Sequence, residues 1–572
     1  MFLLHLFRSF LPLRNPIGFG ASDFIELALA ALLLVFALAW RPWMEPHAAA
    51  LAKRTGWCMA LLALLPVLLR LALLPHHPVP TPDIYDEFGH LLVADTLRHF
   101  RLANPAHPLH QFFETFFVLQ QPTYSSIYPI GQGLLLALGW TIFGLPWAGV
   151  LLSVAALCAL CYWMLRGWTT PAWALAGGLL AVMEFGPLNQ WMNSYWGGAL
   201  PAAAGCLVFG ALPRVRNGRN LRAAVLLGVG LAIHLLTRPY ESIFLLLAVI
   251  LFFTPALRKK DELHALLKPA LAAALIVLPA AGITILQNRR VTGSWTTLPY
   301  TLSQYQYGVP AALTFQANPA PHLPLTPEQA LDYKMQLSFR GSRPETIESY
   351  LMRLWYRVRF YRFFFLAPLY LALPAFLPAL REFRFVWVSL SLLLFALGVN
   401  FFPAFQFHYV AAVTCLFVLV SVTGLRQLSR LSIRGYPAGP LAARVILFLC
   451  AAQILLWYGL HLFDDSEMSQ AMRQYETWQT INHRNPERRI FVNGLLARLP
   501  GRQLVFVRYW PGHIFQYEWV YNAADIDGAR VVWARDLGPE ENEKLRRYYP
   551  DRTVWLLEPD ARPPRLTPYP GQ

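Results

Sequence analysis

The sequence predicts a polytopic α-helical membrane protein. Of its 572 residues, 56% are hydrophobic and only 14% are charged, whereas soluble proteins carry roughly 25% charged residues. Too few charged side chains remain to cover the surfaces of several soluble domains. The formal net charge of +16 could indicate nucleic-acid binding, but the basic residues interrupt apolar runs instead of forming a stripe or an arm. We therefore expect no nucleic-acid partner.

Apolar segments follow one another along most of the chain. A membrane-spanning helix needs about 20 largely apolar residues. We expect twelve spans, at residues 24–40, 57–74, 146–165, 171–185, 196–212, 223–237, 242–257, 269–286, 363–380, 385–402, 409–425 and 445–462. Residues 1–23 contain an interrupted apolar stretch without a clear cleavage site, so we expect an interfacial segment there and not a signal peptide.

A thirteenth apolar stretch, residues 133–143, is too short for an ordinary span. Short cytoplasmic loops carry an excess of Lys and Arg. If this stretch crosses the membrane, basic loop 41–54 falls on the opposite side from four others, at 214–222, 258–268, 381–384 and 426–444. If it is re-entrant or juxtamembrane, all five loops are cytoplasmic. The sequence therefore predicts a transmembrane domain at 24–462, with large outer loops at 76–147 and 288–362.

The C-terminal residues 463–572 are expected to form a small soluble α/β domain on the outer face. Residues 504–507, 531–534 and 553–557 are short β-rich apolar runs, and 540–549 are helical in character. Because no glycine-rich nucleotide loop accompanies them, a structural or acceptor-docking module is favoured over a second active site. All six cysteines lie within apolar segments, which argues against a disulfide framework.

The densest polar cluster directly follows the second predicted span. Asp83, Asp86, Glu87 and His90 are spaced i, i+3, i+4 and i+7, which places them on one face of a helix. Three carboxylates at a membrane boundary repel each other and are costly to desolvate. A solvated helix face is the structural alternative. The outer-face position and the scarcity of charge elsewhere favour a functional role.

Three motifs carry a family resemblance: Asp86-Glu87, Tyr128-Pro129 and Asn193-Ser-Tyr-Trp-Gly-Gly198. The membrane part, roughly residues 50–460, resembles the GT-C glycosyltransferases. It is most similar to bacterial members of the superfamily of dolichyl-phosphate-mannose protein mannosyltransferases and aminoarabinose transferases. The resemblance implies a GT-C-like fold in the bacterial inner membrane, with the C-terminal domain in the periplasm. It also implies sugar transfer from a polyprenyl-phosphate donor to a lipid, glycan or protein acceptor.

The chemistry that the resemblance implies explains why carboxylates are needed. A lipid phosphate is already a good leaving group, so one carboxylate base suffices for a single inverting displacement. Hydrolases differ because they need two cooperating carboxylates. We expect Asp86 to be the base and Glu87 to position the acceptor or to tune the base, and the reverse assignment stays open.

Basic and polar side chains near the outer ends of spans are expected to bind the donor phosphate, since Arg favours bidentate contact. The expected donor-binding residues are Arg238, Tyr128, Gln132, His408, Tyr409 and Arg289, the last together with Arg290. Snorkelling at the interface would explain Arg238 equally well. The expected acceptor or sugar pocket comprises Asp83, His90, Asn193, Tyr195, Trp196 and Tyr305, with Tyr300, Gln304 and Tyr307 in the same loop. The basic and aromatic run at 353–362 is expected to anchor the protein in the interface, and donor binding is the alternative.

No cofactor or metal ligand is assigned. Glu87 and His90 form a single ExxH, whereas helical di-iron sites need two such motifs. A divalent ion therefore stays open but is not favoured. Two other classes also stay open: a transporter or flippase for sugars or polyprenyl lipids, and a non-catalytic factor in envelope-polymer assembly. Transporters typically show internal repeats, and we find none in this sequence.

Overall fold

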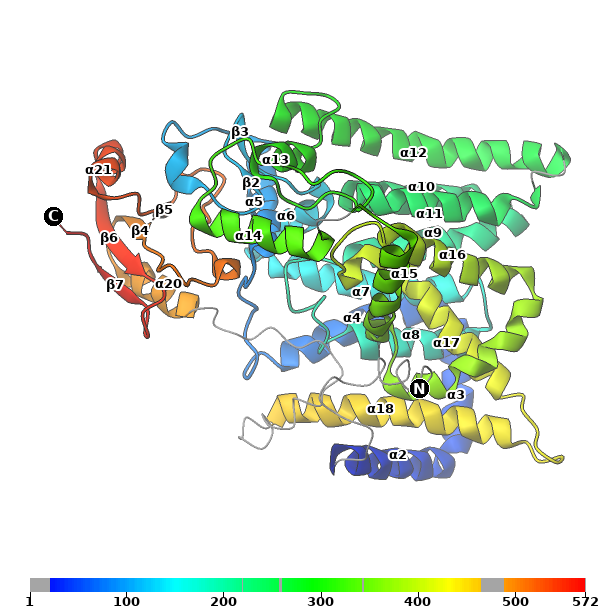
Figure 1. The fold of residues 1–572 in the computed structure, drawn as a ribbon. Coiled ribbons are helices and arrows are strands. Elements are labelled where there is room, and N and C mark those ends of the chain that lie inside the picture. Colours follow the sequence, from blue (N-terminus) through cyan, green and yellow to red (C-terminus); the bar gives the residue numbers. More distant parts are fainter. Residues whose placement is uncertain (1–20, 219, 257–259, 342–343, 464–487, 571–572) are drawn as a thin grey trace.

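The computed structural model describes residues 21–218, 220–256, 260–341, 344–463 and 488–570. A bundle of apolar helices forms most of the molecule, and a small α/β sheet lies at one end of it (Figure 1). The predicted interfacial segment at 1–23 lies, up to residue 20, outside the described residues.

The bundle follows the order of the predicted spans. Its helices are α2 (Ala21–Ala39), α3 (Arg41–Lys53), α4 (Thr55–Ala72), α6 (Ile130–Phe143), α7 (Trp147–Leu165), α8 (Pro171–Phe185), α9 (Ala199–Gly218), α10 (Leu221–Thr237), α11 (Pro239–Phe253), α12 (Lys260–Thr292), α16 (Phe383–Val399), α17 (Thr414–Leu428) and α18 (Ala438–Phe463). The 3₁₀ segment η6 (Phe407–Val413) leads into α17. Part of basic loop 41–54 is thus helical, as α3.

Helices of membrane-spanning length confirm the membrane class, while the predicted number of twelve spans is not confirmed. Within the described ranges, five helices are long and apolar enough to cross a membrane, or six if α2 and α3, which meet at 88°, form one span. Five further helices, α6, α8, α10, α11 and α16, are apolar but have only 10–17 residues. A helix of this length is shorter than the hydrocarbon core of a bilayer, about 30 Å thick.

The predicted continuous helix at 363–380 is wrong. The chain instead forms three short 3₁₀ segments, η3 (Val358–Phe364), η4 (Ala367–Leu371) and η5 (Leu373–Arg381). Pro368, Pro374 and Pro378 fall within these segments. Proline removes a backbone donor and clashes with the preceding turn, so an apolar run that is rich in proline cannot continue as one α-helix.

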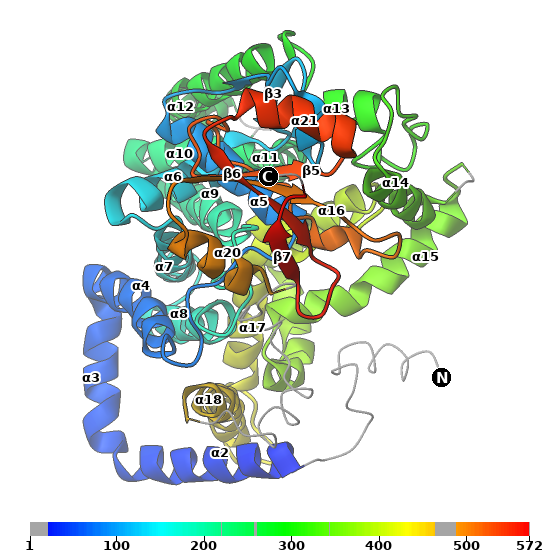
Figure 2. The ribbon, with the colours of Figure 1, turned by 90° about the vertical axis from the view of Figure 1, so that its left-hand side faces the viewer.

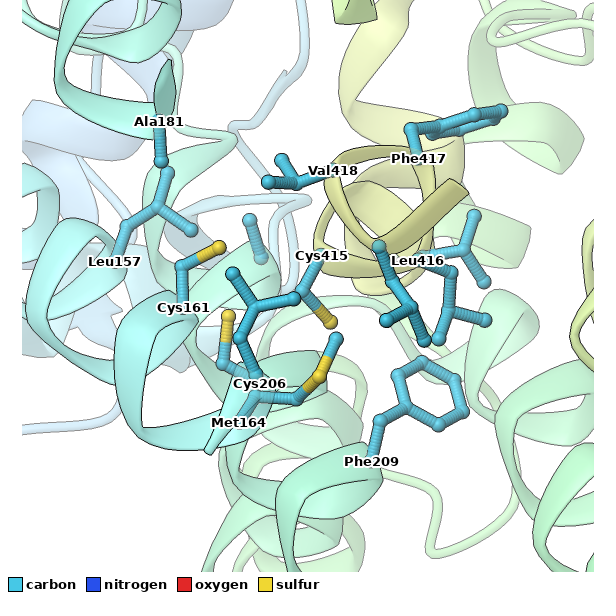
Figure 3. Close-up of a cluster of buried hydrophobic side chains, with 14 of the residues drawn as sticks. Leu157, Cys161, Met164, Ala181, Cys206, Phe209, Cys415, Leu416, Phe417 and Val418 are labelled. Atoms are coloured by element: carbon cyan, nitrogen blue, oxygen red, sulfur yellow. The ribbon is translucent and has the colours of Figure 1, made fainter. Parts of the chain in front are cut away.

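Small residues let the central helices approach closely. Cys161 of α7, Cys206 of α9 and Cys415 of α17 lie together in the buried core (Figure 3). All six cysteines are free and buried. A Cβ on Gly205 would lie 1.8 Å from the carbonyl oxygen of Ala412, so α9 meets η6 backbone to backbone. Such small-residue contacts are typical of helix packing in membranes.

The two large predicted outer loops fold together at one end of the bundle, which we call the loop end. The first contributes α5 (Tyr85–Arg98), η1 (His110–Phe113) and a three-stranded antiparallel sheet of order β1-β3-β2. The second contributes α13 (Pro299–Tyr307), α14 (Pro327–Arg340) and α15 (Ile347–Arg357). The strands are β1 (Asn104–Pro105), β2 (Val118–Leu119) and β3 (Thr123–Ser126).

The C-terminal segment forms a four-stranded sheet of order β5-β4-β6-β7. Strand β4 pairs in parallel with β5 and β6, and β7 pairs antiparallel with β6. The elements are α20 (Arg489–Arg498), β4 (Arg502–Val507), η9 (Phe515–Tyr517), β5 (Val531–Arg535), α21 (Pro539–Tyr548), β6 (Arg552–Glu558) and β7 (Arg565–Pro568). Strand β4 is apolar on both faces because both faces are buried.

One face of this sheet is completed by the first outer loop (Figure 2). The shared core contains Leu504, Phe506, Val532 and Ala534 from the strands and Leu92, Phe112, Phe113 and Tyr124 from the loop. The other face packs on α20 and the 519–520 segment, through Val492, Leu496 and Trp519. The C-terminal sheet is therefore attached to the loop end by a hydrophobic core and not by a flexible contact alone.

Candidate active site

Glu87 forms the N-terminal cap of α5. Ile84 precedes the helix and has no polar side chain, so the Glu87 carboxylate reaches back to the free backbone donors. Its Oε2 accepts hydrogen bonds from the N–H groups of Asp83 at 2.7 Å and Ile84 at 3.3 Å, and its Oε1 accepts one from Tyr195 at 2.8 Å. Burial raises the pKa of Glu87 to about 7, against the effect of these donors. This carboxylate joins α5 to the 186–196 loop.

Asp86, the adjacent carboxylate, has a different environment. It is half-buried, and the Tyr128 hydroxyl donates a hydrogen bond to its Oδ1. Tyr128 is held in turn by Gln287 of α12, whose Nε2 donates to the Tyr128 carbonyl oxygen at 3.0 Å. Burial raises the pKa of Asp86 to about 6, while the Tyr128 hydroxyl and the charge of Arg238 limit this increase. Asp86 is therefore mostly ionised at neutral pH.

Arg238 lies at the junction of α10 and α11. Its Nη2 and Nε lie 2.5 and 3.1 Å from Oε1 of Glu241, and its guanidinium lies 4.7 Å from the ring centroid of Tyr409. Both contacts orient the cation, and it remains close enough to Asp86 to favour the ionised carboxylate. The structure thus brings together Asp86 and Arg238, which are 152 positions apart in the sequence.

Three buried polar atoms near these charges have no hydrogen-bond partner among the described residues: Nδ1 of His90, Nδ1 of His408 and Oε1 of Gln132. His90 packs on Tyr128 at 4.3 Å between ring centroids, and His408 packs on Trp196 at 5.1 Å. Burial, aided by the charge of Arg238, lowers the pKa of His90 to about 3, so its ring is neutral. Buried polar groups are rarely left unpaired, so these atoms are suited to bind a polar ligand.

Asp332 of α14 belongs to the same cluster, although the sequence analysis did not identify it. It is completely buried, and Nε2 of Gln336 donates to both of its oxygens, at 3.1 and 3.2 Å. Burial, with a smaller contribution from the charge of Asp86, raises its pKa to about 7. One signal in the sequence could have pointed to the helix that carries Asp332. The capping box at Thr326 and Gln329 marks the start of a helix in the second loop.

Asn193 and Tyr195 hold the loop together instead of facing the charged cluster. Asn193 is completely buried, and its Oδ1 accepts a hydrogen bond from Nε of Arg70 at 2.6 Å. Arg70 also donates to the carbonyl oxygens of His77 and Pro78, at 2.9 and 3.0 Å. The Tyr195 hydroxyl donates to the carbonyl oxygen of Pro80 at 3.0 Å. These hydrogen bonds give both residues a structural role in holding the loop.

Other predicted residues lie at the edge of the cluster. Arg289 is exposed, with its guanidinium on the Gly293 carbonyl oxygen and near the Trp295 ring. Tyr305 is 58% exposed and stacks on His322. Tyr300, from the same helix as Tyr305, is the tyrosine that lies close to Arg238 and Asp86. Asp83 contributes its backbone N–H to Glu87.

The residues of the cluster do not form a metal-binding group. In the part of the chain that the structure describes, no three His, Cys, Asp or Glu side chains are arranged to hold a metal ion.

The fold and the site define an α-helical membrane protein with a carboxylate and an arginine gathered at its loop end. No protein-family model and no curated protein matches the chain.

Solved structures similar to the chain include ArnT from Cupriavidus metallidurans in the apo state, with a TM-score of 0.48 and 11% identity over 88% of this chain and 93% of ArnT. The same protein bound to undecaprenyl phosphate gives a TM-score of 0.47 and 12% identity over the same shares. The archaeal oligosaccharyltransferase AglB from Archaeoglobus fulgidus, in complex with an inhibitory peptide and a dolichol-phosphate, gives a TM-score of 0.37 and 11% identity over 88% of this chain and 69% of AglB.

Proposed function

We propose that the protein is a membrane glycosyltransferase that moves a sugar from a polyprenyl-phosphate donor to a hydroxyl or amine acceptor. The observation that carries this proposal is the half-buried Asp86 carboxylate, which is held by Tyr128 and lies close to the Arg238 cation. Asp86 can act as a base and Arg238 can bind an anion, both at the membrane end of the loop cluster. This arrangement suits a donor that has a charged phosphate and an apolar lipid chain. We place the site on the outer face of a bacterial inner membrane, with the C-terminal domain in the periplasm.

The reaction is a single inverting displacement. Asp86 takes the proton from the acceptor, the acceptor oxygen or nitrogen forms a bond to the anomeric carbon, and the bond from that carbon to the phosphate oxygen breaks. The released phosphate carries the negative charge and is held by Arg238, so no acid is needed to protonate it. A base with a pKa of about 6 is well matched to this role near neutral pH.

The remaining residues of the cluster bind the two substrates. Besides Arg238, the donor-binding residues are Tyr128, Gln132, His408 and Tyr409. We assign the sugar and the acceptor to the group with His90, Trp196, Tyr300 and Asp332. Because the pKa of Asp332 is about 7, part of the population carries a protonated carboxyl that can donate to an acceptor hydroxyl.

Purified protein in detergent tests the proposal directly. We expect transfer of the sugar from a synthetic polyprenyl-phosphate sugar to envelope lipid, glycan or protein fractions, detected as a mass increment on the acceptor. No membrane gradient exists in detergent, so a transporter gives no product. Absence of transfer together with accumulation of the lipid or sugar in vesicles would contradict the enzyme. Mass spectrometry of the envelope from a deletion strain would identify the sugar and the acceptor.

The Tyr128→Phe variant is expected to shift the pH dependence of transfer. Transfer by the native protein should fall as the pH decreases through about 6, because the Asp86 base becomes protonated. The Tyr128 hydroxyl stabilises the ionised carboxylate, so its removal raises the pKa and moves this acidic limb to higher pH. A hydrogen bond to a charged group contributes roughly 1.5–3 kcal/mol, or about 1–2 pH units. The measurement is kcat/KM between pH 5 and 8.

Tyr305→Phe serves as the matched control, because Tyr305 is exposed and lies at the edge of the cluster. Its pH profile should match that of the native protein. An acidic limb that stays in place in Tyr128→Phe would show that Asp86 is not the group that titrates.

A further inference from the structure

We propose that the C-terminal domain positions the active site by holding helix α14 through Arg535. This inference rests on the proposed function, because it concerns the placement of Asp332 beside Asp86. It assigns to the domain a role in assembling the reaction site rather than a second activity.

A buried ion-pair network connects the domain to α14. Arg535 ends strand β5, and its Nη2 donates to Oε2 of Glu328 at the start of α14. Its Nη1 lies 3.3 Å from Oε2 of Glu518, and Oε1 of the same carboxylate accepts a hydrogen bond from the Tyr509 hydroxyl. The side chains of Arg535, Glu328 and Glu518 are 8%, 9% and 1% exposed. Charges this deeply buried must be paired, so the position of Glu328 is set by the domain.

The spacing of residues along α14 links the position of Glu328 to the position of Asp332 in the reaction site. Glu328 and Asp332 are four residues apart and therefore lie one turn apart on the same side of the helix. Fixing Glu328 against the C-terminal domain thus sets how far Asp332 reaches toward Asp86. A second contact lies one turn further on, where Nε2 of Gln516 approaches Sδ of Met335 at 3.6 Å.

The same domain also contacts α5, which carries Asp86. Tyr521 stacks on Phe88 with ring centroids 4.4 Å apart and an interplanar angle of 2°, and the Arg489 guanidinium lies 4.8 Å from the Phe88 centroid. The Ala524 N–H donates to Oδ2 of Asp95 at 2.8 Å. The same domain therefore contacts both helices that supply carboxylates, and it can set the separation between Asp86 and Asp332.

We call the contact between Arg535 and Glu328 that holds α14 the clamp, and Glu328→Gln is the variant that tests it. It keeps the shape of the side chain and leaves Arg535 paired with Glu518, so the domain is expected to fold. We expect kcat to fall roughly 10- to 100-fold, the range for a misplaced reactive group. The donor KM should stay unchanged, because Arg238 is not affected. Arg508→Gln is the matched control: it removes the Arg508–Asp536 ion pair of the same domain, in which Arg508 is 48% exposed, and should leave kcat unchanged.

Cross-linking tests whether the lost activity can be restored. A variant that had simply failed to fold would not recover activity in this way. Cysteines introduced at Met335 and Gln516 in the Glu328→Gln background can be joined by a short bismaleimide, since the six native cysteines are buried. Recovery of kcat after cross-linking would support the clamp. A Glu328→Gln variant with native kcat, or a cross-linked variant that stays as slow as the uncross-linked one, would overturn it.

Amide hydrogen exchange separates this inference from the proposed function. If the native protein transfers no sugar, the proposed function fails, but the clamp still predicts faster exchange across 327–340 in Glu328→Gln than in the native protein. Unchanged exchange in α14 would overturn the clamp, whether or not sugar transfer is observed.

Discussion

Replacing Asp86 with Asn is expected to reduce the kcat of sugar transfer by roughly 10³-fold, within the range for loss of a general base. The amide keeps the size of the carboxyl and can still accept the hydrogen bond from Tyr128, so α5 should remain folded. It cannot take the proton from the acceptor. The assay is transfer from a synthetic polyprenyl-phosphate sugar by detergent-purified protein, with the amount of folded protein checked by thermal unfolding.

Two controls make this result specific. Asp551→Asn removes an exposed carboxylate of the C-terminal domain and should leave kcat unchanged. Glu87→Gln should lower the melting temperature, because the carboxylate accepts three backbone N–H groups, and a hydrogen bond to a charged group contributes roughly 1.5–3 kcal/mol. The Glu87→Gln protein that remains folded should retain most of its kcat. The reverse, with Asp86→Asn active and folded Glu87→Gln inactive, would exchange the two assignments.

Replacing Arg238 with Gln is expected to reduce kcat/KM by roughly 10²- to 10³-fold, because the phosphate loses a charge-assisted contact in the ground state and in the transition state. Arg238→Lys retains the ion pair with Glu241 and the charge but not the planar donor geometry, so its effect should be intermediate. Kinetics at varied donor concentration and binding of unmodified polyprenyl phosphate would measure the two contributions.

Arg289→Gln is the matched control for Arg238, because it removes an exposed arginine that lies outside the Asp86 cluster. Its kcat/KM and its binding of polyprenyl phosphate should remain unchanged. If Arg289→Gln instead weakens binding while Arg238→Gln does not, the donor phosphate is bound at the end of α12 and Arg238 is an interfacial anchor.

The spacing of Asp83, Asp86, Glu87 and His90 predicts a common helical face. In the structure α5 begins at Tyr85, so Asp86, Glu87 and His90 lie in the helix and Asp83 precedes it. The prolines at 368, 374 and 378 are also local signals, and the continuous helix predicted at 363–380 was wrong because proline interrupts an α-helix.

Residues far apart in the sequence were harder to predict because their partners cannot be read from spacing. Asp86 and Glu87 are adjacent in the sequence, and the reverse assignment of their roles stayed open there. The Tyr195 N–H, 108 positions away, occupies the Glu87 carboxylate, while Asp86 stays half-buried beside Tyr128. Asp332 was missed for the same reason: only the folding of the second loop against the first brings it near Asp86.

By itself, then, the sequence determined the membrane class, the order of the apolar segments and the carboxylate cluster of the first loop. These depend on hydrophobic periodicity and charge, which act between residues a few positions apart. Only the tertiary structure decided which carboxylate accepts the three backbone N–H groups, which arginine lies beside the other carboxylate and how the C-terminal sheet completes its core. Those outcomes depend on which buried groups find partners across the fold, because desolvation makes an unpaired polar group costly and thereby selects one packing.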